Sequence, residues 1–177
     1  MWHQDGAPAG DLGCGPYGFD GGEGRRAGGG VCQDGYVKLT SHLADDRRVH
    51  VEGRLRANLM AWLTTVRPDG RPDSVPVWFL LRDDETILIY SRAAKVKLRN
   101  ISHNPRVSVG LDVTDLGRDV IRIDGTAEHV PGFPAADQVP EYVVKYAERI
   151  GALFGTAPQF AALFPEALII TPHRLHA

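Results

Sequence analysis

Apolar and polar positions after about residue 40 follow the two-residue period of β-strands in several segments. Arg106 to Val113 alternates most clearly, which is typical of a strand with one buried face. Runs rich in β-branched and aromatic residues predict further strands at 59–66, 74–81, 86–91, 119–130 and 167–175. Residues 67–72 hold Pro, Asp and Gly in an order that tight turns prefer, so the first two of these strands form a hairpin. Gly125 interrupts the 119–130 strand and predicts a bulge or a close backbone approach.

Helical spacing marks four segments around these strands. Helices are predicted at 41–58, 94–103, 141–154 and 157–164. One face of the first carries Leu43, Val51, Leu55 and Leu59, and Ser41 is its predicted N-cap. One side of the third carries Val144, Ala147 or Ile150, and Phe154. Residues 131–140 predict a loop with at most one helical turn. Six strands in mostly hairpin order predict a mainly β class with α decorations, built as an antiparallel barrel.

Residues 1–36 follow neither period. Twelve of the chain's 20 glycines lie there, and Leu12 and Val31 are almost its only large aliphatic residues. Such a segment buries too little apolar area to offset its ordering entropy, so we predict a disordered Gly-rich head followed by a folded domain at 41–177. Cys14 and Cys32 both fall in this head and are interpreted as free thiols rather than as a disulfide or a zinc site.

The overall charge excludes some classes of partner. A net charge of −2 and a pI near 6.4 argue against a general nucleic-acid binder and against a basic membrane-surface protein. No apolar run approaches the roughly 20 residues that a membrane helix needs, and no signal peptide is recognisable. The expected compartment is the cytoplasm.

Residues 91–106 carry the clearest candidate chemistry. This stretch holds five of the 20 Lys and Arg residues and none of the 22 acids, and it leads from an apolar strand into a helix. A helix N-terminus favours phosphate, with Ser91 adding a hydroxyl and Lys95 and Lys97 adding charge. Residues two apart do not share a helix face, so the lysines converge only if Lys95 is still in the loop and Lys97 lies in the first turn. A solvated basic helix face remains the alternative.

A second candidate is the apolar stretch 75–79. Pro76 cannot donate to a strand ladder, so it marks an edge or an opening that could present backbone groups to a planar ring. Trp78 and Phe79 should point to opposite faces. A core strand with an edge proline is the alternative. The histidines show no metal-ligand spacing, the aspartates after residue 111 suit solvated turns, and no catalytic residue or metal site is assigned. These absences fit chemistry performed by a bound cofactor.

The chain resembles the pyridoxamine 5'-phosphate oxidase-like split-barrel proteins. The segments that carry this resemblance are 62–72, 74–79, 89–91, 97–101 and 104–107. Within that family the chain looks most similar to the actinobacterial branch that uses the deazaflavin coenzyme F-420. The resemblance extends from about Leu43 to Arg174 and implies an FMN-binding split barrel that forms a homodimer, with two cofactor clefts at the interface.

The resemblance also implies roles for individual residues. Ser91, Lys95 and Lys97 would hold the cofactor phosphate. The strand Val75, Pro76, Val77 and Trp78 would line the ring system, with Thr64 and Thr65 beside it and Arg174 near the cleft. Arg92 has no matching role and is expected to point to solvent.

The chain departs from true pyridoxamine phosphate oxidases at its end. It finishes at Arg174-Leu175-His176-Ala177, without the C-terminal tryptophan and the Arg-Leu-x-Pro tail that help those enzymes to bind substrate. Oxidation of pyridoxamine phosphate is therefore not expected. The leading hypothesis is an oxidoreductase in which reduced coenzyme F-420 gives a hydride to an electron-poor small molecule, such as an activated double bond or a quinone-like ring. The alternatives are an FMN-dependent oxidase or reductase and a non-catalytic carrier of flavin or deazaflavin.

Overall fold

The computed structural model describes residues 39–113, 117 and 119–177. All described helices and strands belong to the unit Tyr36–Ala177. The predicted Gly-rich head and its two cysteines lie outside the described residues. In the part of the chain that is described, no helix is long and apolar enough to cross a membrane.

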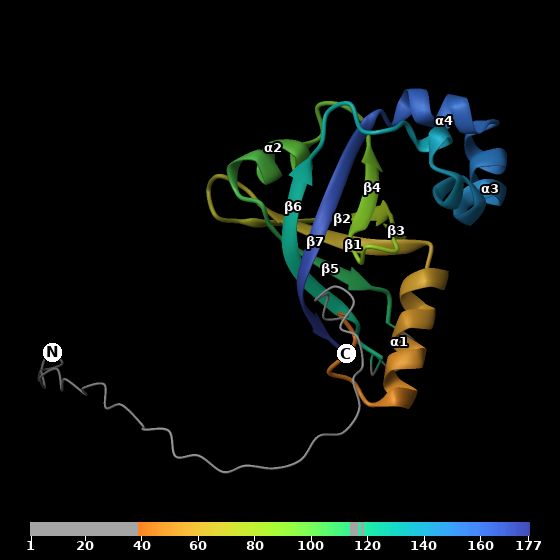
Figure 1. Ribbon diagram of the computed structural model, residues 1–177. Coiled ribbons are helices and arrows are strands. Elements are labelled where there is room, and N and C mark those ends of the chain that lie inside the picture. The colour runs from red at the N-terminus through yellow and green to blue at the C-terminus, as the bar shows by residue number, and fades with distance from the viewer. Residues whose placement is uncertain (1–38, 114–116, 118) are drawn as a thin grey trace, which may run out of the picture. The chain divides into compact units, whose positions relative to one another are not determined.

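The domain is built on a single curled antiparallel sheet. Its strands are β1 (Met60–Val66), β2 (Pro72–Trp78), β3 (Leu80–Leu81), β4 (Ile87–Ser91), β5 (Arg106–Leu111), β6 (Arg122–His129) and β7 (Glu166–His176). Across the described residues their order is β2-β1-β5-β6-β7-β4-β3. Figure 1 shows β1, β2 and β5 crossing the direction of β6 and β7, which is the curl that closes the sheet into a half-barrel.

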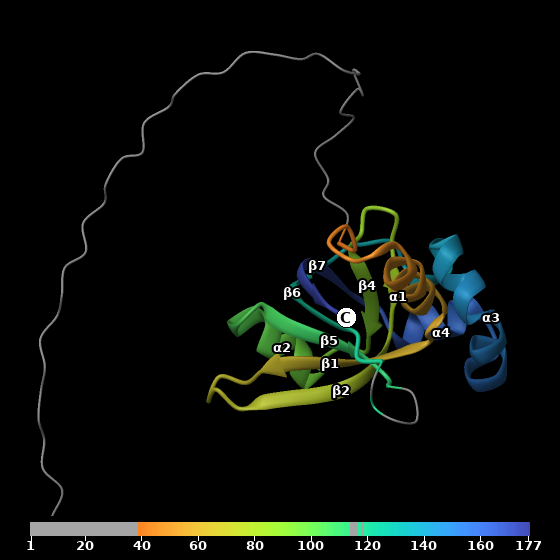
Figure 2. The same cartoon turned by 90° about the horizontal axis from the view of Figure 1, so that it is seen from below.

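Helices cover the sides of this half-barrel. They are α1 (Asp45–Ala57), α2 (Val96–His103), the short 3-10 turn η1 (Ala136–Gln138), α3 (Pro140–Phe154) and α4 (Ala157–Leu163). Figures 1 and 2 both place α3 and α4 together on one side of the sheet, while α2 lies on the other. The mainly β split-barrel class is confirmed, and each predicted helix and strand overlaps an observed one, although several of the bounds differ.

The predicted strand 74–81 is divided into β2 and β3 at Phe79. The Phe79 N–H donates to the hydroxyl oxygen of Tyr146, 2.7 Å away, and the same hydroxyl lies 2.7 Å from the Phe79 carbonyl oxygen. A side chain of α3 therefore satisfies the backbone of Phe79 in place of a neighbouring strand. Because this partner comes from 67 residues away in the sequence, the local pattern does not reveal the break.

Gly125 is required by a close approach between β6 and β7, as predicted. The register shifts between Asp124 and Gly125. A Cβ atom at Gly125 would lie 2.5 Å from the backbone carbonyl oxygen of Thr171. No larger residue fits there without moving one of the two strands.

Two predicted details of the helices are wrong. Ser41 does not cap α1, which begins at Asp45 after Ala44 and has no side-chain cap. On α3, Val144 is 78% exposed, whereas Tyr142, Tyr146 and Ile150 are buried. The buried face follows tyrosines, whose aromatic bodies pack like apolar side chains although their hydroxyls make them look polar in a sequence.

Asp119 is also more than a solvated turn residue. Its carboxylate accepts hydrogen bonds from Arg47 at 2.6 Å and from Arg54, and it contacts the His50 ring nitrogen at 2.8 Å. Hydrogen bonding from His50 is the largest of the causes that lower the pKa of Asp119. This carboxylate attaches α1 to the segment that precedes β6.

Two hydrophobic cores meet at β4. Ile87 and Ile89 face the barrel core, whereas Leu88 and Tyr90 face a second core formed with α3 and α4. All five residues of β4 are buried because both of its faces are covered. The second core positions the candidate site described next.

Candidate functional site

A cavity of about 400 Å³ lies between β2, the end of β4, the start of α2 and the helices α3 and α4. Its walls are formed by Pro76, Val77, Trp78, Tyr90, Ser91, Arg92, Lys95, Lys97, Tyr142, Leu153, Phe154, Phe160 and Phe164. Six of the residues that the sequence singled out therefore come together here: Pro76, Val77, Trp78, Ser91, Lys95 and Lys97. They converge from two stretches that are about 15 residues apart.

The two lysines meet the geometric condition that the sequence set. Lys95 is the N-cap residue of α2 and has an extended backbone, while Lys97 lies in the first helical turn. Burial lowers the pKa of Lys97, and the neighbouring charge of Lys95 lowers it further. That shift has the direction expected when two cations share a partly dehydrated space.

The charges of Lys95 and Lys97 have no acidic partner in the first turn of α2 or among the described residues that line the cavity. The N-cap side chain makes no hydrogen bond to the first turn of α2, and that turn contains no acidic residue. None of the side chains that line the cavity is acidic. Free backbone N–H groups, the positive end of the helix dipole and two ammonium groups all favour an anion here.

The turn before α2 shows how this end is shaped. Ser91 is 1% exposed, and its hydroxyl donates to the carbonyl oxygen of Arg92 at 3.0 Å. Ala94 has a φ of +58°, a left-handed conformation that is unusual for a residue with a side chain. This conformation directs the chain from the buried end of β4 to the exposed start of α2.

Arg92 is exposed, as expected, but its side chain also borders the cavity. It lines the cavity, and its guanidinium carbon lies 5.1 Å from the centre of the Phe164 ring. This is the range of a cation–π contact. Arg92 therefore adds a third cation to the residues that line the cavity, and it contacts Phe164 at the end of α4.

The remaining wall is aromatic. Trp78 stacks on Tyr146 with ring centres 4.6 Å apart and an angle of 5° between the planes, and it also stacks on Phe160 at 5.5 Å. Phe79 is buried in the barrel core instead, so the prediction that Trp78 and Phe79 face opposite sides is confirmed. The rings of Trp78, Phe154, Phe160 and Phe164 therefore line this side of the cavity.

The residues that α3, α4 and the C-cap of α4 contribute to this wall were not predicted from the sequence. They are Tyr142, Leu153, Phe154, Phe160 and Phe164. Aromatic residues at 142, 146, 160 and 164, spaced by four within each helix, were the available signal. A four-residue spacing identifies a buried face but not the strand against which it packs.

Four predicted residues lie outside this cavity. Val75 packs at the edge of the barrel core, and Thr64 is paired with Ser74 through their hydroxyls at 2.7 Å. Thr65 is fully buried. Arg174 lines a different cavity, of about 700 Å³, near the end of β7. That larger cavity mixes Arg174 with Asp84 and Glu85, so it lacks the single sign of charge found beside α2.

Comparison with known proteins identifies the family. Residues 48–171 match the pyridoxamine 5'-phosphate oxidase family. The chain belongs to this family. No curated protein sequence matches the chain.

Several solved structures share the fold of this chain. A protein described as an F420 reductase is 26% identical, with a TM-score of 0.56, over 71% of this chain and 94% of its own. The conserved hypothetical protein Rv2991 from Mycobacterium tuberculosis is 20% identical, with a TM-score of 0.58, over 75% of this chain and 82% of its own. The heme storage protein HutZ from Vibrio cholerae is 18% identical, with a TM-score of 0.53, over 73% of this chain and 92% of its own.

Proposed function

We propose that this protein is an oxidoreductase that binds the deazaflavin coenzyme F-420 in the cavity beside α2. The reduced coenzyme would supply a hydride to an electron-poor small molecule. The observation that carries the proposal is a single cavity with Arg92, Lys95 and Lys97 at one end and stacked aromatic rings along its wall. The similarity to the F420 reductase supports the choice of cofactor.

The chain's own residues would bind and orient the cofactor. Lys95, Lys97 and the N–H groups that begin α2 suit its phosphate, because charge-assisted hydrogen bonds are the strongest that a protein offers to this group. Pro76 and Val77 would border the ring from β2. The aromatic wall excludes water from the reacting face, and no protein acid or base is needed if solvent supplies the final proton.

FMN is the second candidate cofactor, because the same phosphate end and flat apolar wall suit it equally. A protein that only carries flavin or deazaflavin is the alternative outside enzymes. Haem is less suited to this cavity, since no histidine, methionine or cysteine is among the described residues that line it.

Binding measurements on matched variants test the proposal. Lys95→Ala/Lys97→Ala should weaken binding of FMN or the deazaflavin by about 3 kcal/mol or more, close to a hundredfold in Kd, because two charged hydrogen bonds are lost. Arg99→Ala is the control, since it removes a charge from the exposed side of the same helix, away from the cavity. Isothermal titration measures all three proteins. Unaltered affinity in the double variant would show that the phosphate binds elsewhere.

Turnover separates an enzyme from a carrier. Protein loaded with the reduced deazaflavin should be oxidised by quinones or activated alkenes faster than the free coenzyme is. Tight binding with no such acceleration for any acceptor would favour the carrier. The cofactor retained after purification from a host that makes both coenzymes, identified by absorption and mass spectra, decides between F-420 and FMN.

We also propose that the protein forms a homodimer that completes this cavity. Met60 and Trp62 on β1 are 41% and 47% exposed, which is high for large apolar side chains. Trp62 lies opposite Pro76 in the β1–β2 pair, and Pro76 lines the cavity. A second copy on this face would therefore also cover the edge of the cofactor site.

Light scattering at micromolar concentration should give a dimer mass, and Trp62→Glu should yield a monomer that binds cofactor more weakly. A monomeric wild-type protein would contradict this part of the proposal.

A further inference from the structure

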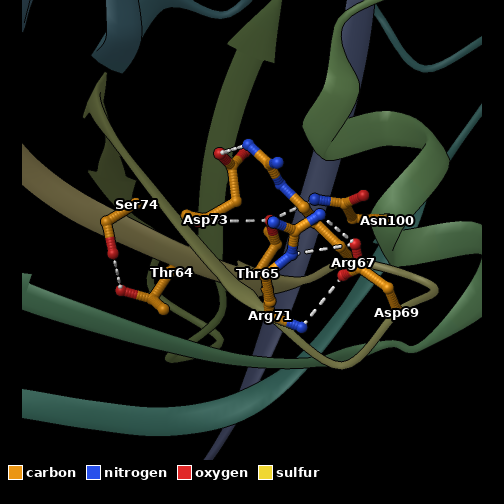
Figure 3. Close-up of polar contacts among 8 residues, drawn as sticks. All are labelled: Thr64, Thr65, Arg67, Asp69, Arg71, Asp73, Ser74 and Asn100. Carbon is orange, nitrogen blue, oxygen red and sulfur yellow. Dashed lines mark hydrogen bonds and ion pairs between the residues drawn. The ribbon is translucent and has the colours of Figure 1, made fainter.

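Two fully buried polar side chains connect α2 to the β1–β2 hairpin. Asn100 on α2 and Thr65 on β1 are both 0% exposed. The Asn100 amide nitrogen donates to the Thr65 hydroxyl oxygen at 2.9 Å, and that hydroxyl donates to the backbone carbonyl oxygen of Asp73 on β2 at 3.3 Å. Figure 3 shows this chain of contacts, with Asn100 reaching the hairpin from the helix. The hydroxyl accepts from one element and donates to another, so it joins both.

The hairpin end of this network is fixed in turn. Thr65 lies directly opposite Asp73 in the β1–β2 register. The Asp73 carboxylate accepts a hydrogen bond from the Arg67 guanidinium at 2.9 Å (Figure 3). From Asp73, β2 runs on to Pro76, Val77 and Trp78 at the wall of the cavity. Asn100 is thus tied to the same strand that borders the proposed cofactor ring.

The helix end carries the proposed phosphate site. Asn100 follows Lys97 by three residues, close to one turn of α2. This helix has only eight residues, and Asn100 and Ile101 are its only buried ones. So short a helix has little stability of its own and takes its orientation from its contacts. The direction in which its N-terminus points therefore depends on how Asn100 and Ile101 are held.

Stability alone does not account for an amide at this position. The Asn100 side-chain oxygen is buried and has no hydrogen-bond partner among the described residues. A buried polar atom without a partner lowers stability, and an apolar side chain of similar size would avoid this cost. The amide nitrogen, in contrast, makes a directional contact that an apolar residue would lack.

We propose that the Asn100–Thr65 hydrogen bond is a positioning device that sets the affinity of the cavity for a phosphate-bearing cofactor. It fixes the N-terminus of α2 relative to β2, so that the phosphate end and the ring wall stand at a set spacing. Thr65 then acts through Asn100 rather than by touching the cofactor. This inference rests on the proposed function of the cavity.

Four variants of the full chain test it, with FMN and the deazaflavin as probes. Thr65→Val removes the hydroxyl and keeps the shape, Asn100→Leu removes the amide, and the double variant removes both. Ser102→Ala is the matched control, because the Ser102 hydroxyl bonds only to Arg99 within α2. We expect each single variant to weaken cofactor binding about five- to tenfold. The double variant should be no weaker than the poorer single variant, since both remove the same contact.

A purely structural role makes a different prediction. It would lower the unfolding midpoint of each variant while leaving the affinity of the folded protein unchanged. Equal affinity in wild type, Thr65→Val and Asn100→Leu would therefore overturn the inference, as would additive losses in the double variant.

Amide hydrogen exchange in cofactor-free protein provides a readout that does not depend on the proposed function. Thr65→Val should speed exchange of the amides of α2 and leave those of α3 unchanged, whereas Ser102→Ala should change neither. If the wild type binds neither FMN nor the deazaflavin, the proposed function fails, and exchange still decides the positioning role. Unchanged exchange of α2 in Thr65→Val would overturn that role.

Discussion

The barrel core and the aromatic core beyond β4 are built from different materials. The barrel core is almost entirely aliphatic, with Leu63, Ile87, Ile89, Ile123 and Ile170 among its fully buried members. The second core consists mainly of stacked rings, and the open cavity borders it. Branched aliphatic side chains pack closely together, whereas flat rings leave gaps between them.

Polar side chains are buried beside both cores, as Asn100 and Thr65 are beside the barrel core. The Tyr142 hydroxyl and the Lys145 ammonium nitrogen are buried without hydrogen-bond partners among the described residues. Burial is the main cause that raises the pKa of Tyr142 and lowers that of Lys145. The two cores therefore differ in the side chains that build them, branched aliphatics in the barrel and rings in the second core, and the candidate cavity is lined by rings of the second core.

The largest expected effect of a substitution is therefore in the barrel core. Leu63→Ala should lower the free energy of unfolding by about 3 kcal/mol, because a fully buried leucine leaves a cavity in a well-packed region. Leu163→Ala is the matched control, since Leu163 on α4 is 46% exposed and should cost less than about 1 kcal/mol. Chemical denaturation measures both. Similar losses at the two sites would show that burial in the barrel core does not set the cost of losing a leucine.

Gly125→Ala should have the next largest effect. The new methyl group would meet the Thr171 carbonyl oxygen at 2.5 Å, and two paired backbones cannot move apart as easily as a side chain can turn. We expect a loss of about 2 kcal/mol. Gly110→Ala, on β5 of the same sheet, is the control because nothing lies within 4 Å of its added methyl group. A Gly125→Ala protein as stable as Gly110→Ala would show that β6 and β7 adjust freely.

Phe164→Leu should affect binding more than stability. It removes the ring over which Arg92 is held, and Phe164 is only half-buried. Cofactor affinity should fall about three- to fivefold, in line with a cation–π contact of about 0.5–1 kcal/mol. Arg92→Gln should produce a similar loss, and the two changes together should not add. An unfolding free energy that falls while affinity is unchanged would place Phe164 with the structural residues.

Local patterns in the sequence predicted most of the fold. Strand alternation and the turn at 67–72 depend on neighbouring residues, and both were confirmed. The break at Phe79 and the buried face of α3 were not predicted, because each depends on Tyr146 meeting a distant strand. Tertiary contacts of this kind leave no periodic signal in the segment that they alter.

The candidate site was likewise predicted only in part, since its cationic end was recognised and its aromatic wall was not. The cationic end was recognised because its charges and the start of a helix are contiguous in sequence. The aromatic wall was missed because α3 and α4 follow α2 by more than 35 residues, with two strands in between. The contact between Arg92 and Phe164 was not predicted for a related reason, since the two residues lie 72 positions apart.

The smallest expected effect is the contribution of Lys145 to the free energy of unfolding, which can be tested by varying the pH. Its ammonium nitrogen lies 4.1 Å from the centre of the Phe79 ring, and burial lowers its pKa to about 8. An unfolded lysine titrates near about 10.4, so between roughly pH 8 and 10 the unfolded chain binds more protons at this group than the folded chain does. The free energy of unfolding should therefore rise with pH across this interval, whereas below it both states are protonated and Lys145 adds no pH dependence.

Lys145→Met should remove that rise, because the methionine fills similar space and does not titrate. We expect a contribution of about 1 kcal/mol or less, since the side chain is partly exposed and solvent screens its charge. The interval must end near pH 10, because burial raises the pKa of Tyr90 to about 12 and ionisation of tyrosine in the unfolded chain then acts in the opposite direction. Urea titrations at pH 7, 8, 9 and 10 measure the slope in both proteins. Parallel slopes for wild type and Lys145→Met would show that Lys145 keeps its charge beside the rings of Phe79 and Tyr146.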